Sequence, residues 1–87
     1  MKTQTYRIKD MHGLNSRASA SVVAEANRYK STLTLKYNDE EADLKSIMNV
    51  MALVIRCGEE FSISAEGVDE EAAINGITKH MEEIGLI

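Results

Sequence analysis

The sequence has few of the residues on which disulfide-bonded or membrane-spanning proteins depend. Its 87 residues include one cysteine and neither tryptophan nor proline. The lone Cys57 excludes a disulfide framework, and no N-terminal stretch combines a basic start with an apolar run, so we expect a reduced, cytoplasmic setting. The longest mainly apolar run, 47–55, is too short to cross a bilayer. We therefore expect a soluble protein with no membrane partner.

Acidic residues outnumber basic ones by 14 to 10, and the net charge of −4 argues against a broad nucleic-acid-binding surface. The acidic residues are absent from two windows, 11–24 and 44–58, which contain Arg17, Lys45 and Arg56. If the fold brings the windows together, one end of the protein becomes locally positive. A chance distribution in a short chain is the alternative.

Metal and cofactor motifs are also missing. His12 and His80 lie far apart and the single cysteine adds no ligand pair, so each histidine is expected to be an ordinary surface or packing residue. We expect no metal and no cofactor. Because no linker, repeat or low-complexity segment interrupts the chain, residues 1–87 are expected to form one domain.

Alternation of polar and apolar residues predicts four strands. Between them the apolar period changes from two to about 3.6, which predicts helices. Asn15 is the natural N-cap of a first helix over 16–29, and Asp69 can cap a last helix that Gly85 ends. The expected strands are 3–9, 32–37, 41–44 and 60–66. The expected buried face of the last helix is Ala73, Ile74, Ile77, Met81 and Ile84.

The segment 46–54 predicts a short helix with scarcely any polar face. So small a core cannot cover all of it, and we expect Val50 and Leu53 to pack inward. Ile47, Met48 and Met51 then stay at least partly exposed, and an adaptable Met-rich patch suggests a protein partner. A helix fully covered by its neighbours is the alternative. The order βαββαβα predicts an α+β fold, with a four-stranded antiparallel sheet and three helices on one face.

The stretch MHGLNSRASASVV, residues 11–23, has the features of an anion site. A glycine turn leads into Asn15 at the expected start of a helix, and Arg17 follows. The amide of Asn15 has no nucleophilic lone pair and no proton to transfer, so we expect no catalytic residue here.

Three segments carry a resemblance to a known family: GLNSRA at 13–18, LKSIM at 44–48, followed by Val50 and Met51, and ISAEG at 63–67. With the element order, they resemble HPr, the histidine-containing phosphocarrier of the bacterial phosphoenolpyruvate-dependent sugar phosphotransferase system. The resemblance runs the length of the chain. It implies an open-faced β-sandwich and a phosphoacceptor protein that is not an enzyme.

In that family a histidine in the first segment accepts phosphate from enzyme I. Here Asn15 occupies its place, Arg17 is retained, and Ala18 replaces a proline. The resemblance therefore implies a carrier site without its nucleophile, as in Crh-like (catabolite repression HPr) members. His12 is an alternative acceptor, although its position before the turn predicts that it lies away from the helix-terminal amides and Arg17.

Ser46 matches a serine that HPr kinase/phosphorylase phosphorylates with ATP and that a LacI-type catabolite control regulator then reads. An N-cap suits an added dianion, with Lys45 and Arg17 as expected neighbours. A cap without a further role is the alternative. The resemblance thus implies a regulatory module in carbon catabolite regulation, read through Ser46, Ile47, Met48, Met51 and Arg17.

Two other functions stay open. One is a phosphocarrier in sugar transport that uses His12 or another acceptor. The second is a degenerate paralogue that binds enzyme I or a metabolic enzyme without being phosphorylated. Exchange of the first strand between two chains, through residues 10–13, is open as well, so the sequence predicts neither a monomer nor a swapped dimer.

Overall fold

The computed structural model describes all 87 residues and contains the seven elements in the predicted order. The first helix ends at Ala26, three residues earlier than predicted, because the Asn27 amide group donates to the carbonyls of Val23 and Lys45 and ties the chain down there. The elements are β1 Lys2–Arg7, α1 Ser16–Ala26, β2 Thr32–Tyr37, β3 Glu40–Asp43, α2 Ile47–Met51, β4 Glu60–Glu66 and α3 Glu70–Glu83.

The strands form one antiparallel sheet in the order β1-β4-β2-β3. Leu35 of β2 pairs with Ile63 of β4 on one side and with Ala42 of β3 on the other. These three apolar side chains share one face because residues directly opposite each other on neighbouring strands point to the same side of a sheet. All three are buried, which identifies this face as the covered one.

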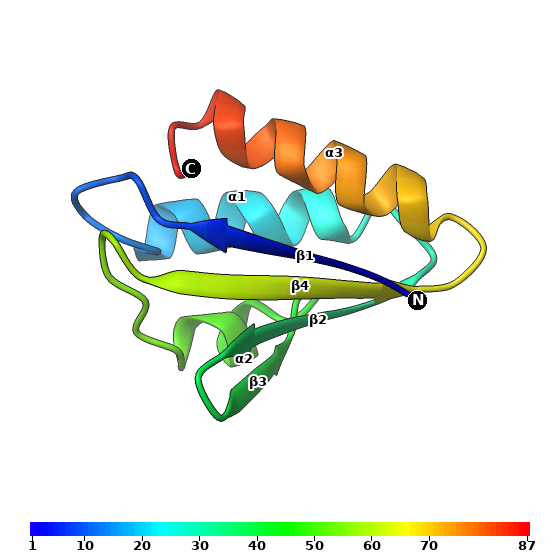
Figure 1. Cartoon of the computed structure of the whole chain (residues 1–87), viewed down its shortest axis with the longest axis horizontal. Coiled ribbons are helices and arrows are strands. Elements are labelled where there is room, and N and C mark those ends of the chain that lie inside the picture. Colours follow the sequence, from blue (N-terminus) through cyan, green and yellow to red (C-terminus); the bar gives the residue numbers. More distant parts are fainter.

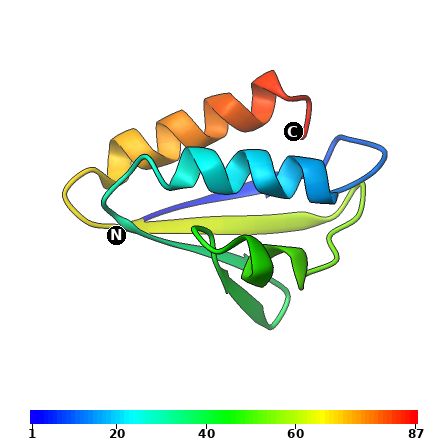
Figure 2. The ribbon, with the colours of Figure 1, turned by 180° about the vertical axis from the view of Figure 1, so that it is seen from behind.

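The helices cover that one face, as predicted. Helices α1 and α3 lie side by side above the sheet, and α2 lies next to α1 and contacts β3 (Figures 1 and 2). The opposite face carries hydroxyl-bearing residues such as Thr3 and Ser64, whose side chains are hydrogen-bonded to each other at 3.0 Å. The protein is therefore an open-faced α+β sandwich. None of its helices combines the length and the apolar character that spanning a membrane requires.

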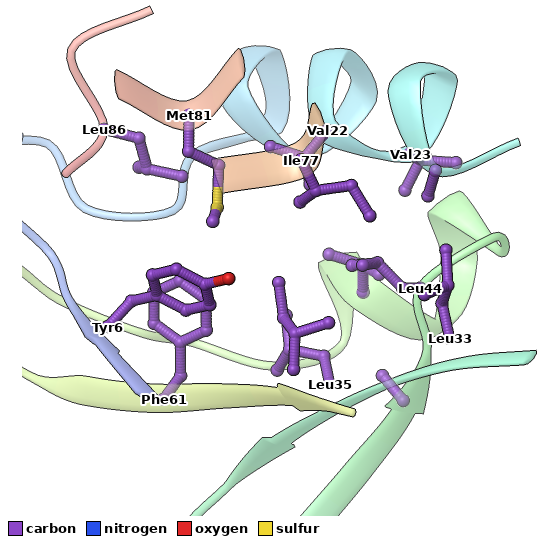
Figure 3. Close-up of a cluster of buried hydrophobic side chains, with 14 of the residues drawn as sticks. Tyr6, Val22, Val23, Leu33, Leu35, Leu44, Phe61, Ile77, Met81 and Leu86 are labelled. Atoms are coloured by element: carbon purple, nitrogen blue, oxygen red, sulfur yellow. The ribbon is translucent and has the colours of Figure 1, made fainter. Parts of the chain in front are cut away.

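The core lies between the two layers, where side chains of α1 and α3 point toward those of the sheet (Figure 3). The rings of Tyr6 and Phe61 pack together with centroids 5.4 Å apart. Ile84 was expected in this core but is 36% exposed. Gly85, with φ of +76°, reverses the chain so that Leu86 is buried instead and its amide donates to the Met81 carbonyl.

Asp69 stands at the N-cap position of α3, but its carboxylate does not cap the helix as predicted. The loop after α1 lies within reach and offers better-placed donors. The carboxylate accepts hydrogen bonds from the amides of Lys30 at 2.8 Å and Ser31 at 2.9 Å, and from the Ser31 hydroxyl. Asp69 therefore ties α3 to the end of α1.

These hydrogen bonds predict a dependence of stability on pH. Donation from the Ser31 hydroxyl and then from the Lys30 amide lowers the pKa of Asp69 below its usual range. A lowered pKa in the folded state means that the carboxylate stabilises the fold above about pH 4 and that this contribution is lost as the pH falls through the folded pKa. Urea unfolding should find Asp69→Asn less stable than the parent at pH 6, with the difference shrinking below pH 4. Asp39→Asn, in an exposed turn, is the control; a difference that stays constant with pH would contradict this prediction.

Candidate functional site

The start of α1 is the first part of the candidate site. Asn15 has an extended backbone, and its side-chain oxygen accepts a hydrogen bond from the Ala18 amide at 2.8 Å. The predicted N-cap is therefore confirmed. Because the side-chain oxygen of Asn15 accepts a hydrogen bond from a helix amide, Asn15 serves here as a structural cap.

The turn before Asn15 is held against the segment that follows α2. The Leu14 amide donates to the Ile55 carbonyl at 2.9 Å, and Gly13 adopts φ of +67°. A β-carbon on Gly13 would lie 2.5 Å from the Ile55 carbonyl oxygen. Only glycine fits this position without displacing the backbone, so the turn and the 55–56 segment form one rigid unit.

The two windows without acidic residues meet at this unit, as the charge pattern suggested. A depression of about 320 Å³ lies between them, and none of its lining residues is acidic. Its walls combine Leu14, Asn15 and Ser19 of the first window with Met51, Leu53 and Arg56 of the second. The guanidinium groups of Arg17 and Arg56 take part in no ion pair within the chain. Two of the three expected cations therefore stand free at this end.

A second depression, of about 570 Å³, opens on the α3 side of α1. Asn15, Arg17 and Ser21 line it, together with His12 and Asp10. His12 also lines the first depression. The expectation that His12 lies away from Arg17 stays a prediction, because two residues that line one depression need not contact each other.

Two acidic residues border the positive end. The Glu59 carboxylate accepts a hydrogen bond from the Arg56 amide at 2.7 Å and a second from the Tyr37 hydroxyl. The Tyr37 hydroxyl, more than the amide, lowers the pKa of Glu59 below its usual range. This carboxylate stays charged at neutral pH and limits the positive potential on the side of Arg56, and Asp10 lines the second depression together with Arg17.

Helix α2 is the second part of the site. Ser46 stands at its N-cap, and the Ser46 hydroxyl accepts a hydrogen bond from the Asn49 amide at 3.3 Å. Val50 and Leu53 are buried, as predicted, whereas Met48 is 77% exposed and Met51 46% exposed. Ile47 is partly buried against the core. The alternative of a fully covered helix is therefore wrong.

The expected cationic neighbours of Ser46 lie elsewhere. The Lys45 ammonium group donates to the Tyr29 carbonyl at 2.6 Å, because the end of α1 presents an unpaired carbonyl there. Arg17 lies at the opposite end of α1 from Asn27, which contacts the Lys45 carbonyl. At 1.5 Å per residue this separation is roughly 15 Å along the helix. The structure thus brings Met51 to Arg17's end of α1 and leaves Ser46 at the other end.

Sequence reasoning missed one arrangement at the site. The Ser21 hydroxyl and the Nε2 atom of His80 are 2.7 Å apart, which joins α1 to α3. The sequence contains a partial signal, since Ser21 follows Arg17 by four residues and therefore shares its helix face. Ser21 and His80 are 59 residues apart in the sequence, so no local pattern could have predicted that they meet.

The fold and the site define a class of small protein with two exposed features: a helix entrance suited to an anion and a Met-rich helix that begins with a serine. The family model described as the PTS HPr component phosphorylation site matches residues 2–83. The phosphocarrier protein HPr of Mycoplasma capricolum is 40% identical over 80 residues, which cover 92% of this chain and 90% of that protein.

Solved structures of similar proteins point to the same family. The histidine-containing phosphocarrier protein of a Mycoplasma superposes with a TM-score of 0.96 at 37% identity, covering 99% of this chain and 98% of that one. Crh of Bacillus subtilis, described as a domain-swapped dimer, superposes with a TM-score of 0.75 at 32% identity over the whole of both chains. The chain belongs to the HPr family. Proteins of this family are phosphocarriers of the sugar phosphotransferase system that interact with enzyme I, and they are not enzymes.

Proposed function

We propose that this protein is a cytoplasmic regulatory member of the HPr family that carries no phosphate on Asn15 and is switched by phosphorylation of Ser46. One observation carries the proposal: the residue at the family's histidine position caps a helix through its side-chain oxygen. The remaining amide nitrogen of Asn15 has a delocalised lone pair, so it cannot attack phosphorus as a neutral imidazole does. This loss of the nucleophile is the feature shared with Crh-like members.

Ser46 is suited to act as a switch because of what surrounds it. Its hydroxyl is partly exposed and makes one long hydrogen bond, to the Asn49 amide. Since Lys45 is bound to the Tyr29 carbonyl and Arg17 lies a helix length away, no side chain of the expected pair neutralises a phosphate here. The added dianion would remain available to basic groups of a partner.

The apolar part of the proposed partner surface lies beside Ser46. Ile47, Met48 and Met51 line one exposed side of α2, and the flexible methionine side chains adapt to different partners. Asn15 and Arg17 would extend the surface to the other end of α1, which is roughly 15 Å away. A partner that buries about 800 Å² on each side is large enough to cover this span. HPr kinase/phosphorylase and a LacI-type catabolite control regulator are the proposed partners.

Incubation with ATP and a bacterial HPr kinase tests the proposal. We expect one added phosphate, at Ser46, and none on Ser46→Ala, because the variant lacks the acceptor oxygen. Intact mass and peptide mass spectrometry measure both. Ser62→Ala, on the open face of the sheet, is the matched control and should accept phosphate like the parent. Phosphate on another residue, or none under conditions that modify an ordinary HPr, would contradict the switch.

The second candidate function, a phosphocarrier that uses His12, is favoured by the position of His12 in the wall of both depressions. A phosphohistidine is labile to acid, so enzyme I with phosphoenolpyruvate should leave acid-labile phosphate on the parent only if this function holds. A protein modified in neither reaction would be an unphosphorylated paralogue that binds enzyme I or a metabolic enzyme.

A further inference from the structure

Helices α1 and α3 lie side by side over the sheet (Figures 1 and 2). Their side chains bring together a serine, a histidine and a glutamate. The Ser21 hydroxyl lies 2.7 Å from Nε2 of His80. On the other side of the ring, Nδ1 of His80 lies 4.0 Å from a carboxylate oxygen of Glu25. The order is therefore hydroxyl, imidazole and carboxylate, the order in which a base and its orienting group activate a serine.

Glu25 is fixed in place by its own partners. Its side chain is only 11% exposed, and its carboxylate accepts hydrogen bonds from the Tyr29 hydroxyl at 2.9 Å and from Arg28. In the tautomer of His80 with its proton on Nδ1, that proton faces the Glu25 carboxylate, whose oxygen lies 4.0 Å from Nδ1. Nε2 then presents a lone pair to the Ser21 hydroxyl. Glu25 is a positioning residue, since it acts only through His80.

Ser21 lines the 570 Å³ depression together with Arg17 and Asn15. Arg17 precedes Ser21 by one helical turn, which places their β-carbons roughly 6 Å apart on the same face. The Arg17 side chain, which makes no ion pair within the chain, therefore starts one turn from the hydroxyl in the same depression, where its guanidinium can bind an incoming phosphoryl group. Asp10 also lines this depression and is the one carboxylate that opposes an anion there.

We propose that Ser21 is a second phosphoryl acceptor of this protein, with His80 as its base and Arg17 as the phosphate-binding group. The proposed donor is a protein phosphohistidine. This acceptor is separate from the proposed switch at Ser46, which takes its phosphate from ATP.

The Ser21 oxygen attacks phosphorus, and an O–P bond forms as the N–P bond of the donor breaks. The Ser21 proton moves to Nε2 of His80, which becomes an imidazolium and later loses that proton to water. The electron pair of the N–P bond stays on the donor ring, which leaves as neutral imidazole when its other nitrogen carries a proton. A serine ester has a lower transfer potential than a phosphohistidine, so the transfer runs one way and leaves a stable mark.

The test uses the full chain with enzyme I and radiolabelled phosphoenolpyruvate, followed by acid treatment that removes phosphohistidine and spares phosphoserine. We expect acid-stable label on Ser21 of the parent, and on the matched control Ser62→Ala. Ser21→Ala should lose it entirely. His80→Ala should lose about a hundredfold or more in rate, the lower end of the range for removal of a general base. Parent protein without acid-stable label would overturn the proposal.

Chemical rescue with imidazole distinguishes a role of His80 as the base from a purely structural role of the Ser21–His80 contact. The His80 side chain is 26% exposed, so its removal leaves a space open to solvent. Added imidazole should restore labelling of His80→Ala and should have no effect on Ser21→Ala. Undiminished labelling of His80→Ala, or no rescue of a folded His80→Ala protein by imidazole, would show that His80 is not the base. Phosphorylation of the same variants at Ser46 by the ATP-dependent kinase checks that they are folded.

Discussion

Replacing Asn15 with histidine is expected to give this protein an acid-labile phosphate where the parent has none. The imidazole would stand at the start of α1, and loss of the Asn15 side-chain oxygen would free the Ala18 amide that it now occupies. Unpaired amides at a helix N-terminus and the free guanidinium of Arg17 would then stabilise a phosphoryl group on the ring. This is the largest functional change that we expect from a single substitution.

The rate of this transfer is expected to be lower than that of an ordinary HPr. By the resemblance, Ala18 stands where the family's helix has a proline that fixes φ, so we expect the new imidazole to be held less rigidly. The resemblance likewise implies that Asn49, which is exposed on α2, replaces a smaller residue, usually glycine, on the face toward partners. Both differences affect the positioning of the histidine and not its chemistry.

Radiolabel transfer from phosphoenolpyruvate through enzyme I measures the effect, with acid lability identifying phosphohistidine. The double variant Asn15→His with Arg17→Ala is the control and should be labelled more slowly, because the guanidinium is gone. Acid-labile label on the unmodified parent would refute the loss of carrier function and favour His12. A folded Asn15→His protein without label would mean that the site differs from a carrier by more than one residue.

The largest loss of stability is expected from Gly13→Ala. The left-handed backbone at φ of +67° costs a non-glycine residue about 1–2 kcal/mol. The new β-carbon would also lie 2.5 Å from the Ile55 carbonyl oxygen, and backbone is less able than a side-chain tip to move away. We expect a total loss of about 3 kcal/mol in the free energy of unfolding, measured in urea.

Gly58→Ala is the matched control for this substitution. Gly58 has φ of +88°, but apart from its chain neighbours no atom lies within 4 Å of the place that a β-carbon would take. The control should therefore lose only the backbone contribution, about 1 kcal/mol. Equal losses in the two variants would mean that the contact between the Gly13 turn and Ile55 adds nothing, and that the two windows are held together by other contacts.

The sequence by itself determined the order of the elements and, apart from Ile84, their buried faces. The strands 32–37 and 60–66 have the predicted bounds, and Asn15 caps α1 as expected. Exposure of Met48 and Met51 also followed from the sequence, because a short helix with apolar residues all round cannot be covered by so small a core. Each of these features depends on residues within about four positions of one another, or on the period with which apolar residues recur.

The tertiary structure decided which partner each polar side chain takes. Asp69 had a cap available at α3 but binds the amides of Lys30 and Ser31, and Lys45 binds the Tyr29 carbonyl instead of facing Ser46. His12 and Arg17 line one depression, and the Ser21 hydroxyl meets the His80 ring across 59 residues of sequence. A long polar side chain can satisfy its hydrogen bonds in several ways of similar free energy, so the choice depends on which segments the packed core brings within reach. Local sequence pattern therefore predicted the helices and strands of this protein. Packing of the core decided which polar side chains, such as Ser21 and His80, come into contact.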